Sequence, residues 1–227
     1  MAGSRGGGPG WLGLRDGSRR SSSRTGHRTR RRTPFGYSSA GVQLISAALA
    51  EATGDSVLDF SRTVLFDLLT VDTEPAMQQL AVLANLPEYL AADFAWPVDR
   101  QGVQQGWSFL KLRPRDMQAF GQLILDHGEW HGDQVVPESW VHEATSAQVE
   151  VVERTSYGYL WWRTTLAGHD AIAALGYGGQ SVIIVPDLDL VAVTVTELAK
   201  EDLHSDISPI NMLNVVESAV AVGYGRR

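Results

Sequence analysis

The 227-residue sequence contains no cysteine, which excludes a disulfide framework, a thiolate zinc site and a cysteine nucleophile. It has no uninterrupted apolar run of about eighteen residues or more, so a transmembrane helix is excluded on length. Lysine is also scarce, since it occurs only at Lys111 and Lys200. The chain length and a hydrophobic content of 44% nevertheless suffice for one sizeable domain with its own core.

Charge is unevenly distributed along the chain. The formal net charge is -7, yet residues 1–33 contain nine Arg and a single Asp. Residues 34–227 are therefore strongly acidic, and we expect them to have no attraction for nucleic acid or anionic lipid.

Residues 1–33 are dominated by Gly, Ser and Arg, which predicts a disordered tail because so few apolar residues cannot offset the entropy of ordering. We favour a solvated tail without a specific role. One alternative is an Arg-rich nucleic-acid tail, although interleaved aromatic residues are lacking. Another is a twin-arginine export signal at Arg31-Arg32, which would require removal of a segment after Phe35 that we expect to be a structural helix.

Helical periodicity begins after Ser38 or Ser39, either of which can cap a helix, and Gly54 ends it. A second amphipathic helix is predicted to follow, with its apolar face formed by Val57, Phe60 and Val64. Residues 70–105 lack periodicity and contain three prolines, which indicates a long excursion with one short helix, of the kind that often walls a substrate cleft.

The second half of the chain alternates helices and strands. Helices are predicted from Pro114 up to Gly128, from Pro137, and from Ser208. Strand spacing is found over residues 157–164, 171–175, 180–185 and 190–197, with Val191, Val193 and Val195 expected on one face. The turns between these segments are too short for crossover connections, which favours an antiparallel meander.

Three glycines lie between two of the apolar strands, in Ala174-Leu-Gly-Tyr-Gly-Gly-Gln180. Glycine lets another backbone or a ligand approach the main chain closely, as in an active-site strand, whereas the simpler interpretation is a β-bulge. A phosphate-binding loop is excluded because a strand follows instead of a helix N-terminus.

Four segments carry a family resemblance through their shared order along the chain. They are Phe35-Gly-Tyr-Ser-Ser39 before Ala52-Thr-Gly54, Leu110-Lys-Leu-Arg-Pro-Arg-Asp-Met117 with Gly121-Gln-Leu-Ile-Leu125, Tyr157-Gly-Tyr-Leu-Trp-Trp162, and Gly176-Tyr-Gly-Gly-Gln180. Together they resemble the motifs of class C type serine β-lactamases and their relatives: penicillin-binding carboxypeptidases, family VIII esterases and 6-aminohexanoate-dimer hydrolases. The resemblance covers roughly residues 34–221, and the order argues against chance agreement.

The resemblance implies a fold and roles for single residues. The fold would be α+β of β-lactamase/transpeptidase type, with an antiparallel sheet flanked by helices on both faces, a helical lobe, and an incomplete N-terminus. Tyr37 matches the tyrosine that acts as general base or proton relay, although a phenol bonded to the backbone is the simpler interpretation. The backbone N–H of Gln180 would be an oxyanion-hole donor. The expected substrate-binding residues are Ser39, where many relatives have Asn, Tyr157, Trp161, Tyr177, Gly178 and Gly179.

The Ser-x-x-Lys signature, which carries the nucleophile and its base, precedes the Tyr motif in this family. Ser108-Phe-Leu-Lys111 fits the pattern, but it follows Tyr37 in an extended stretch, and we interpret it as a coincidence. We therefore expect a serine hydrolase of esters or amides that lacks its catalytic Ser and Lys as written. The alternative is a truncated product or pseudoenzyme that acts as a binding module. Residues 190–197 would then form an open, Val-rich edge that aggregates or needs a partner.

No metal or cofactor is expected. His127 and His131 have the spacing of a zinc-binding helix, but Gly128 between them breaks the helix, so we interpret them as surface residues. The expected partner is a small ester or amide, with neither nucleic acid nor membrane involved. The compartment is not indicated, although relatives are often secreted or periplasmic.

Overall fold

The computed structural model describes residues 35–79, 85–152, 154–196 and 209–224. Contacts divide the chain into Met1–Thr33 and Pro34–Arg227, and all described residues belong to the second unit. The predicted disordered tail and both alternatives for it therefore lie outside the described residues.

The first elements are helical: α1 (Ser39–Thr53), α2 (Val57–Ser61), the π-helical turn η1 (Arg62–Phe66) and α3 (Leu86–Ala91). Ser38 caps α1, because its Oγ accepts a hydrogen bond from Gly41 N–H at 3.1 Å. Gly54 ends the helix in a left-handed conformation with a φ of 76°. The predicted bounds of this helix are confirmed, and α3 is the short helix expected within the excursion.

The helix predicted after Gly54 exists, but its buried face was predicted wrongly. α2 passes directly into η1, and a π turn is wider than an α turn, so the side chains that follow it rotate about the axis. Phe66, at the end of the π turn, is buried together with Leu58 of α2, whereas Val64 is 41% exposed. Of the face expected from periodicity, Val57 alone is buried and Phe60 is half-buried.

A six-stranded antiparallel sheet dominates the rest of the described chain, with strands in sequence order. The strands are β3 (Val149–Val152), β4 (Thr155–Tyr157), β5 (Trp162–Leu166), β6 (His169–Leu175), β7 (Ser181–Val185) and β8 (Leu190–Thr194). A separate hairpin of β1 (Glu129–Trp130) and β2 (Asp133–Gln134) precedes it, and the 3-10 turn η2 (Pro186–Leu188) joins β7 to β8. The predicted meander is confirmed.

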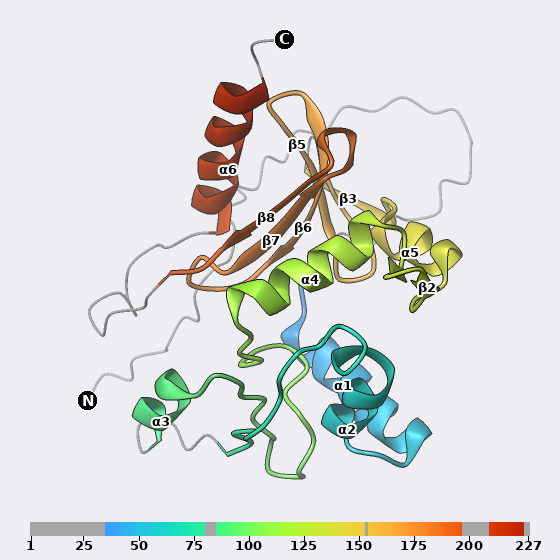
Figure 1. Ribbon diagram of the computed structural model, residues 1–227, viewed down its shortest axis with the longest axis vertical. Coiled ribbons are helices and arrows are strands. Elements are labelled where there is room, and N and C mark those ends of the chain that lie inside the picture. The colour runs from blue at the N-terminus through green and yellow to red at the C-terminus, as the bar shows by residue number, and fades with distance from the viewer. Residues whose placement is uncertain (1–34, 80–84, 153, 197–208, 225–227) are drawn as a thin grey trace, which may run out of the picture. The chain divides into compact units, whose positions relative to one another are not determined.

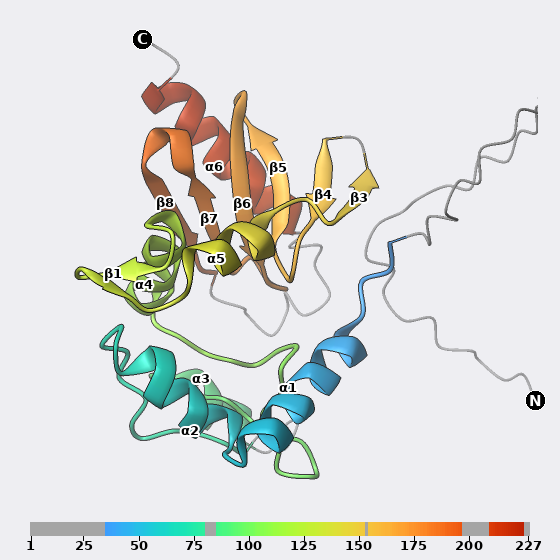
Figure 2. The same cartoon turned by 90° about the vertical axis from the view of Figure 1, so that its right-hand side faces the viewer.

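Helices cover both faces of the sheet, as the fold class requires (Figures 1 and 2). Helices α4 (Pro114–Leu125) and α5 (Glu138–Thr145) lie on one face, and α6 (Pro209–Tyr224) lies on the other. Alternate residues of β7 face the two layers: Val182 and Ile184 pack toward α4, whereas Ile183 and Val185 pack with Val216 of α6.

Helix α4 lies between the other helices and the sheet and packs against both. Leu123 is completely buried in the cluster formed by α2 and η1, whereas Ile124 packs against the sheet. Gly121 allows the helix to approach the strands closely, because a Cβ there would lie 2.6 Å from Val191 Cγ1 and 2.7 Å from Val182 Cγ1.

The single strand predicted over residues 157–164 is wrong. Gly158 N–H donates to the carbonyl of Trp161 at 2.8 Å, and Leu160 adopts a φ of 69°, so residues 158–161 form a turn between β4 and β5. Tyr157 consequently pairs with Trp162 on the neighbouring strand. Gly158 is required here, because a Cβ would lie 2.2 Å from the carbonyl oxygen of Ala144.

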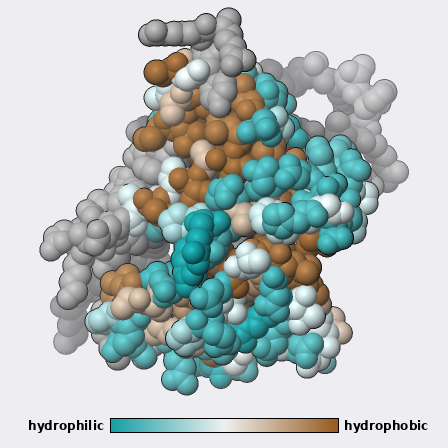
Figure 3. Space-filling model, viewed as in Figure 1, coloured by the Kyte–Doolittle hydropathy of each residue, from teal (hydrophilic) through white to brown (hydrophobic). Residues whose placement is uncertain are grey.

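β8 is the last strand in the order of the described sheet, and none of its residues is fully buried. Figure 3 shows apolar surface on the face of the molecule where β8 and α6 lie. Val191 and Val193 share the face that packs toward α4, as predicted, and Val195 lies beyond the strand end and is 52% exposed. No helix in the described part of the chain is long and apolar enough to cross a membrane.

Candidate active site

An aromatic cluster surrounds Tyr37, which directly precedes α1. The Tyr37 ring stacks on Trp162 with centroids 6.4 Å apart and meets Tyr157 edge-on at 6.3 Å. Phe35 lies 5.2 Å from Tyr157 and 5.8 Å from Trp162. Such pairs are stabilising beyond the apolar area they bury. The cluster therefore fixes the chain just before α1 against the ends of β4 and β5.

Burial, and secondarily the charge of Tyr37, raise the pKa of Tyr157 to about 12. Tyr157 therefore stays a neutral phenol over the whole physiological range. Tyr37 is more accessible, with 52% of its surface exposed. Of the two phenols, Tyr37 is the one that a ligand could reach more easily.

The turn between β6 and β7 holds the glycines singled out in the sequence. Gly178 and Gly179 adopt left-handed φ values of 79° and 84°, which favour glycine. Two threonines at and just beyond the end of β8 donate hydrogen bonds to carbonyls of this turn. Thr194 Oγ1 donates to Gly179 O at 2.8 Å, and the Thr196 hydroxyl donates to Gly178 O. Ser181 Oγ lies 2.6 Å from Thr194 Oγ1, which completes the chain of hydroxyls.

These contacts determine where the Gln180 N–H points. Gly179 C=O and Gln180 N–H belong to one planar trans peptide, in which the two groups point in opposite directions. Because Thr194 holds the carbonyl, the N–H is directed away from the Thr194 side chain. The Gln180 side chain is held as well, since its Oε1 accepts from Thr196 N–H at 3.3 Å. The hydrogen bonds of the turn thus fix the orientation of the Gln180 N–H.

Strand register places the aromatic cluster and the glycine turn at the same end of the sheet. Trp162 is opposite Ala173 of β6, and Leu175, two residues further on, is opposite Ser181 at the start of β7. β5 and β7 are two strands apart, a separation of about 10 Å. The phenol of Tyr37 and the N–H of Gln180 therefore lie near the same end of the sheet.

The other predicted site residues are not all at this end of the sheet. Ser39 is the first residue of α1, two positions from Tyr37, and Tyr177 is 52% exposed in the glycine turn. Trp161 is 8% exposed and stacks on Phe120 of α4 at 5.7 Å, within the core between helix and sheet. Its predicted contact with substrate is not supported by this placement.

Ser108 and Lys111 do not lie on a helical turn. Ser108 lies in a bend outside any helix, whereas the Ser-x-x-Lys pattern needs a helical turn to bring the two side chains together. Lys111 Nζ instead donates to the carbonyls of Tyr89 at 3.1 Å and Leu90 at 2.5 Å, at the end of α3. Burial lowers the pKa of Lys111, and the nearby charge of Asp93 opposes this shift.

The described residues contain no group of three His, Asp or Glu side chains close enough to hold a metal ion. His127 and His131 both have positive φ values, of 54° and 53°, and α4 ends at Leu125 before either of them. The helix that would align the two rings is therefore not formed.

Sequence reasoning missed Trp162, Phe35, Thr194 and Thr196. The strand predicted over residues 157–164 would put Trp162 on the opposite face from Tyr157, whereas the turn at Gly158 pairs the two residues on neighbouring strands. The repeated aromatic residues beside this glycine were the available signal. The two threonines had no local signal, since their role depends on the pairing of β8 with β7.

Comparison with known proteins is consistent with this geometry. A family model described as beta-lactamase matches residues 16–213. No curated protein sequence matches significantly. A solved structure from Bacillus anthracis, assigned as a 6-aminohexanoate-dimer hydrolase, is 21% identical with a TM-score of 0.54, over 84% of this chain and 45% of the other. A penicillin-binding protein from Bacillus halodurans is 13% identical with a TM-score of 0.55, over 82% and 56%.

At these identities the two structures support the fold alone, and the chain spans about half the length of each. The family model, in contrast, covers most of the sequence. Together with the order of the motifs and the six-stranded sheet between helices, this match shows that the chain belongs to the beta-lactamase family.

Proposed function

We propose that residues 34–227 form the proton-relay and oxyanion part of a serine hydrolase that acts on a small ester or amide. The observation that carries the proposal is that Tyr37 packs on Trp162 at the same end of the sheet as the turn that holds Gln180. A proton acceptor and an oxyanion donor on either side of one carbonyl are what acyl transfer requires.

In this mechanism a serine Oγ attacks the carbonyl carbon, and the serine proton is passed through the Tyr37 hydroxyl to the leaving group. The carbonyl oxygen becomes negatively charged and accepts from the Gln180 N–H. The leaving group departs with a proton, and water then attacks the acyl-serine to release the acid. The serine and lysine would come from a segment outside these 227 residues, because Ser108 lies in a bend outside any helix and Lys111 Nζ donates to the carbonyl of Leu90.

A fluorophosphonate probe tests the proposal in two samples, the 227-residue chain and the natural gene product. We expect no labelling of the former, and labelling of the latter at a Ser-x-x-Lys serine outside these residues. Tyr37→Phe should slow that labelling about a hundredfold, the usual contribution of a proton-transfer group. Labelling of Ser108 in either sample would contradict the assignment.

The alternative is a non-catalytic binding module. It is favoured by the position of Lys111, whose ammonium group is committed to the end of α3. Absence of labelling in both samples would support this alternative over the hydrolase.

A further inference from the structure

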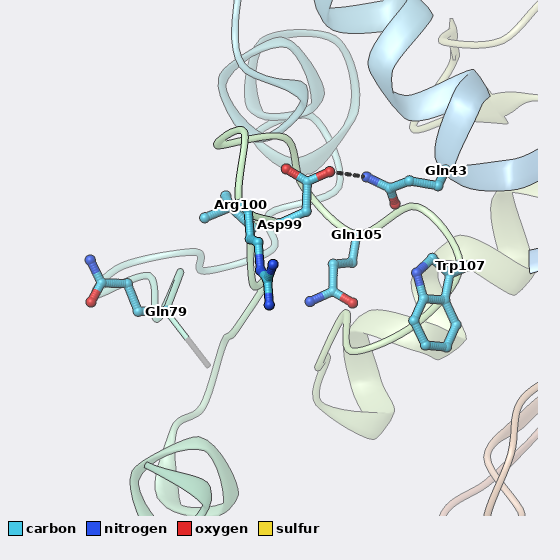
Figure 4. A pocket seen from close by; sticks show the side chains of 7 residues that line it. Gln43, Gln79, Asp99, Arg100, Gln105 and Trp107 are labelled. Carbon is cyan, nitrogen blue, oxygen red and sulfur yellow. Dashed lines mark hydrogen bonds between the residues drawn. The ribbon is translucent and has the colours of Figure 1, made fainter. Parts of the chain in front are cut away.

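A cavity of about 550 Å³ lies beside α1, on the loop that follows residue 97. Figure 4 shows that its walls are mainly polar side chains: Gln43, Gln79, Asp99, Arg100 and Gln105, with the indole of Trp107 at one end. None of these residues belongs to the candidate active site.

The wall formed by α1 and the loop is rigidly built. Gln43 Nε2 donates to Asp99 Oδ2 at 2.9 Å, and Gln43 Oε1 accepts from Gly106 N–H at 3.0 Å. The loop lies directly on the helix, because a Cβ on Gly106 would be 2.9 Å from both Ser46 Cβ and Val42 O. The cavity therefore keeps its shape without a ligand.

Asp99 contributes a fixed negative charge to this wall. Its Oδ1 accepts from Gln101 N–H at 2.8 Å and Val103 N–H at 3.1 Å. These backbone hydrogen bonds are the main reason that the pKa of Asp99 is lowered, with a smaller contribution from Gln43. A ligand anion would be repelled by this carboxylate.

Unused hydrogen-bonding groups complete the lining. Within the described part of the chain, the side chains of Arg100 and Gln105 have no hydrogen-bond or salt-bridge partner, and Figure 4 shows both directed into the space between Gln79 and Trp107. Trp107 is 45% exposed, and its ring is positioned by an edge contact with Phe109 at 5.8 Å. The cavity thus presents donors, acceptors and one open aromatic face.

We propose that this cavity binds an uncharged polyhydroxylated ligand, a saccharide, with one face of the sugar ring packed on Trp107. A hydroxyl both donates and accepts, so it can pair with a glutamine amide, with Arg100 and with Asp99 together. A carboxylate only accepts, so it could pair with Arg100 but would leave the amide oxygens unpaired and would meet Asp99 as a like charge. The open indole face matches the apolar C–H face of a sugar ring. The proposal is independent of the hydrolase function.

The test uses the full chain with maltotriose, N,N′-diacetylchitobiose and, as a carboxylate comparison, N-acetylglycine. Saturation-transfer NMR and titration should show binding of at least one saccharide with a Kd of about 1 mM, a weak affinity suited to an open site. Binding should not change with added salt, because no net charge is neutralised.

Two matched variants locate the site. Trp107→Ala should weaken saccharide binding at least about tenfold, the loss of one aromatic contact. Trp140→Ala removes an equally exposed Trp that stacks on Tyr159 elsewhere in the molecule, and it should bind like the parent. Circular dichroism checks that both variants remain folded. Absence of saturation transfer, equal binding by Trp107→Ala, or salt-sensitive binding of N-acetylglycine alone would each overturn the proposal.

Discussion

Residues 35–113, the helical half, and residues 114–224, the sheet half, are stabilised in different ways. The sheet half depends on apolar packing of α4 and α6 against β6 and β7. The helical half has an apolar cluster to which Leu123 of α4 also belongs, and it adds a buried polar network. In it Gln104, 1% exposed, accepts from Val57 N–H at 3.1 Å and donates to Gln78 at 3.2 Å. Apolar packing tolerates small shifts, whereas a buried hydrogen bond must be made in full.

The largest effect on stability is expected in α4, the helix that packs against both halves. Leu123→Ala removes a fully buried side chain of α4 that faces the helical half, and should cost about 2–5 kcal/mol in the free energy of unfolding. Leu90→Ala, at a position 55% exposed on α3, should change it by less than about 0.5 kcal/mol. Urea unfolding followed by fluorescence measures both. Equal costs would show that α4 does not couple the halves.

A glycine substitution tests the close packing of the sheet half. Gly121→Ala places a methyl group against Val182 and Val191, and should destabilise by about 1–3 kcal/mol. Gly223→Ala in α6, where no atom lies within 4 Å of the new Cβ, should instead stabilise by up to about 1 kcal/mol. A gain in melting temperature for both variants would refute the close approach of α4.

The polar network of the helical half predicts a loss in the same range. Gln104→Leu keeps the approximate shape of the side chain but leaves the Val57 N–H and the Gln78 amide without their partner, at a cost of about 1–3 kcal/mol. Ser56→Ala removes the N-terminal cap of α2, the helix that begins at Val57, and should cost about 1 kcal/mol. If Gln104→Leu left the free energy of unfolding unchanged, the helical half would be stabilised by apolar contacts alone, as the sheet half is.

The halves should also respond to opposite extremes of pH. In the helical half, hydrogen bonds from Ser56, from Glu74 N–H and from Gln101 N–H lower the pKa values of Asp59, Asp72 and Asp99 respectively. Their stabilisation is present above the ordinary pKa of about 4 and is lost as pH falls through the folded values.

In the sheet half, the raised pKa of Tyr157, about 12, favours the neutral phenol in the folded state. Its stabilisation is therefore present below pH 10 and is lost as pH rises from roughly 10 to 12. Urea unfolding at several pH values checks both signs. Asp99→Asn should reduce the acid sensitivity, and Tyr157→Phe the alkaline sensitivity; if either variant left its slope unchanged, that assignment would be wrong.

The smallest effect concerns solubility. β8 is the open edge of the described sheet. Val195, just beyond this strand, is 52% exposed, and Val215 of α6 is 59% exposed. The chain should therefore self-associate with rising concentration, and Val195→Lys with Val215→Lys should shift it toward the monomer on size exclusion. A parent chain that is monomeric at every concentration would show that this edge is not adhesive.

The sheet half was largely predictable because alternating apolar residues and short turns are local signals. The exception is the turn at Gly158, which depends on a close approach to Ala144 that no local pattern reveals. The helical half was less predictable, because the π turn at Arg62–Phe66 shifts the buried face without a marker in the sequence.

The candidate site shows the same division. Tyr37 and the glycines before Gln180 were identified by resemblance, and their roles remain predictions. Trp162 and Thr194 act through strand pairing over long sequence separations, so their positions could be found only once the register was known.

The most direct test of the account is whether Tyr37 and Gln180 share one end of the sheet. The absence of natural cysteine allows a single nitroxide label at Gly36→Cys, where no atom lies within 4 Å of the new Cβ. We predict paramagnetic broadening of the amide signals of Trp162 and Gln180, with the signal of Gly168 at the opposite end of the sheet unaffected. Broadening of Gly168 with a sharp Gln180 signal would contradict the assignment of the site.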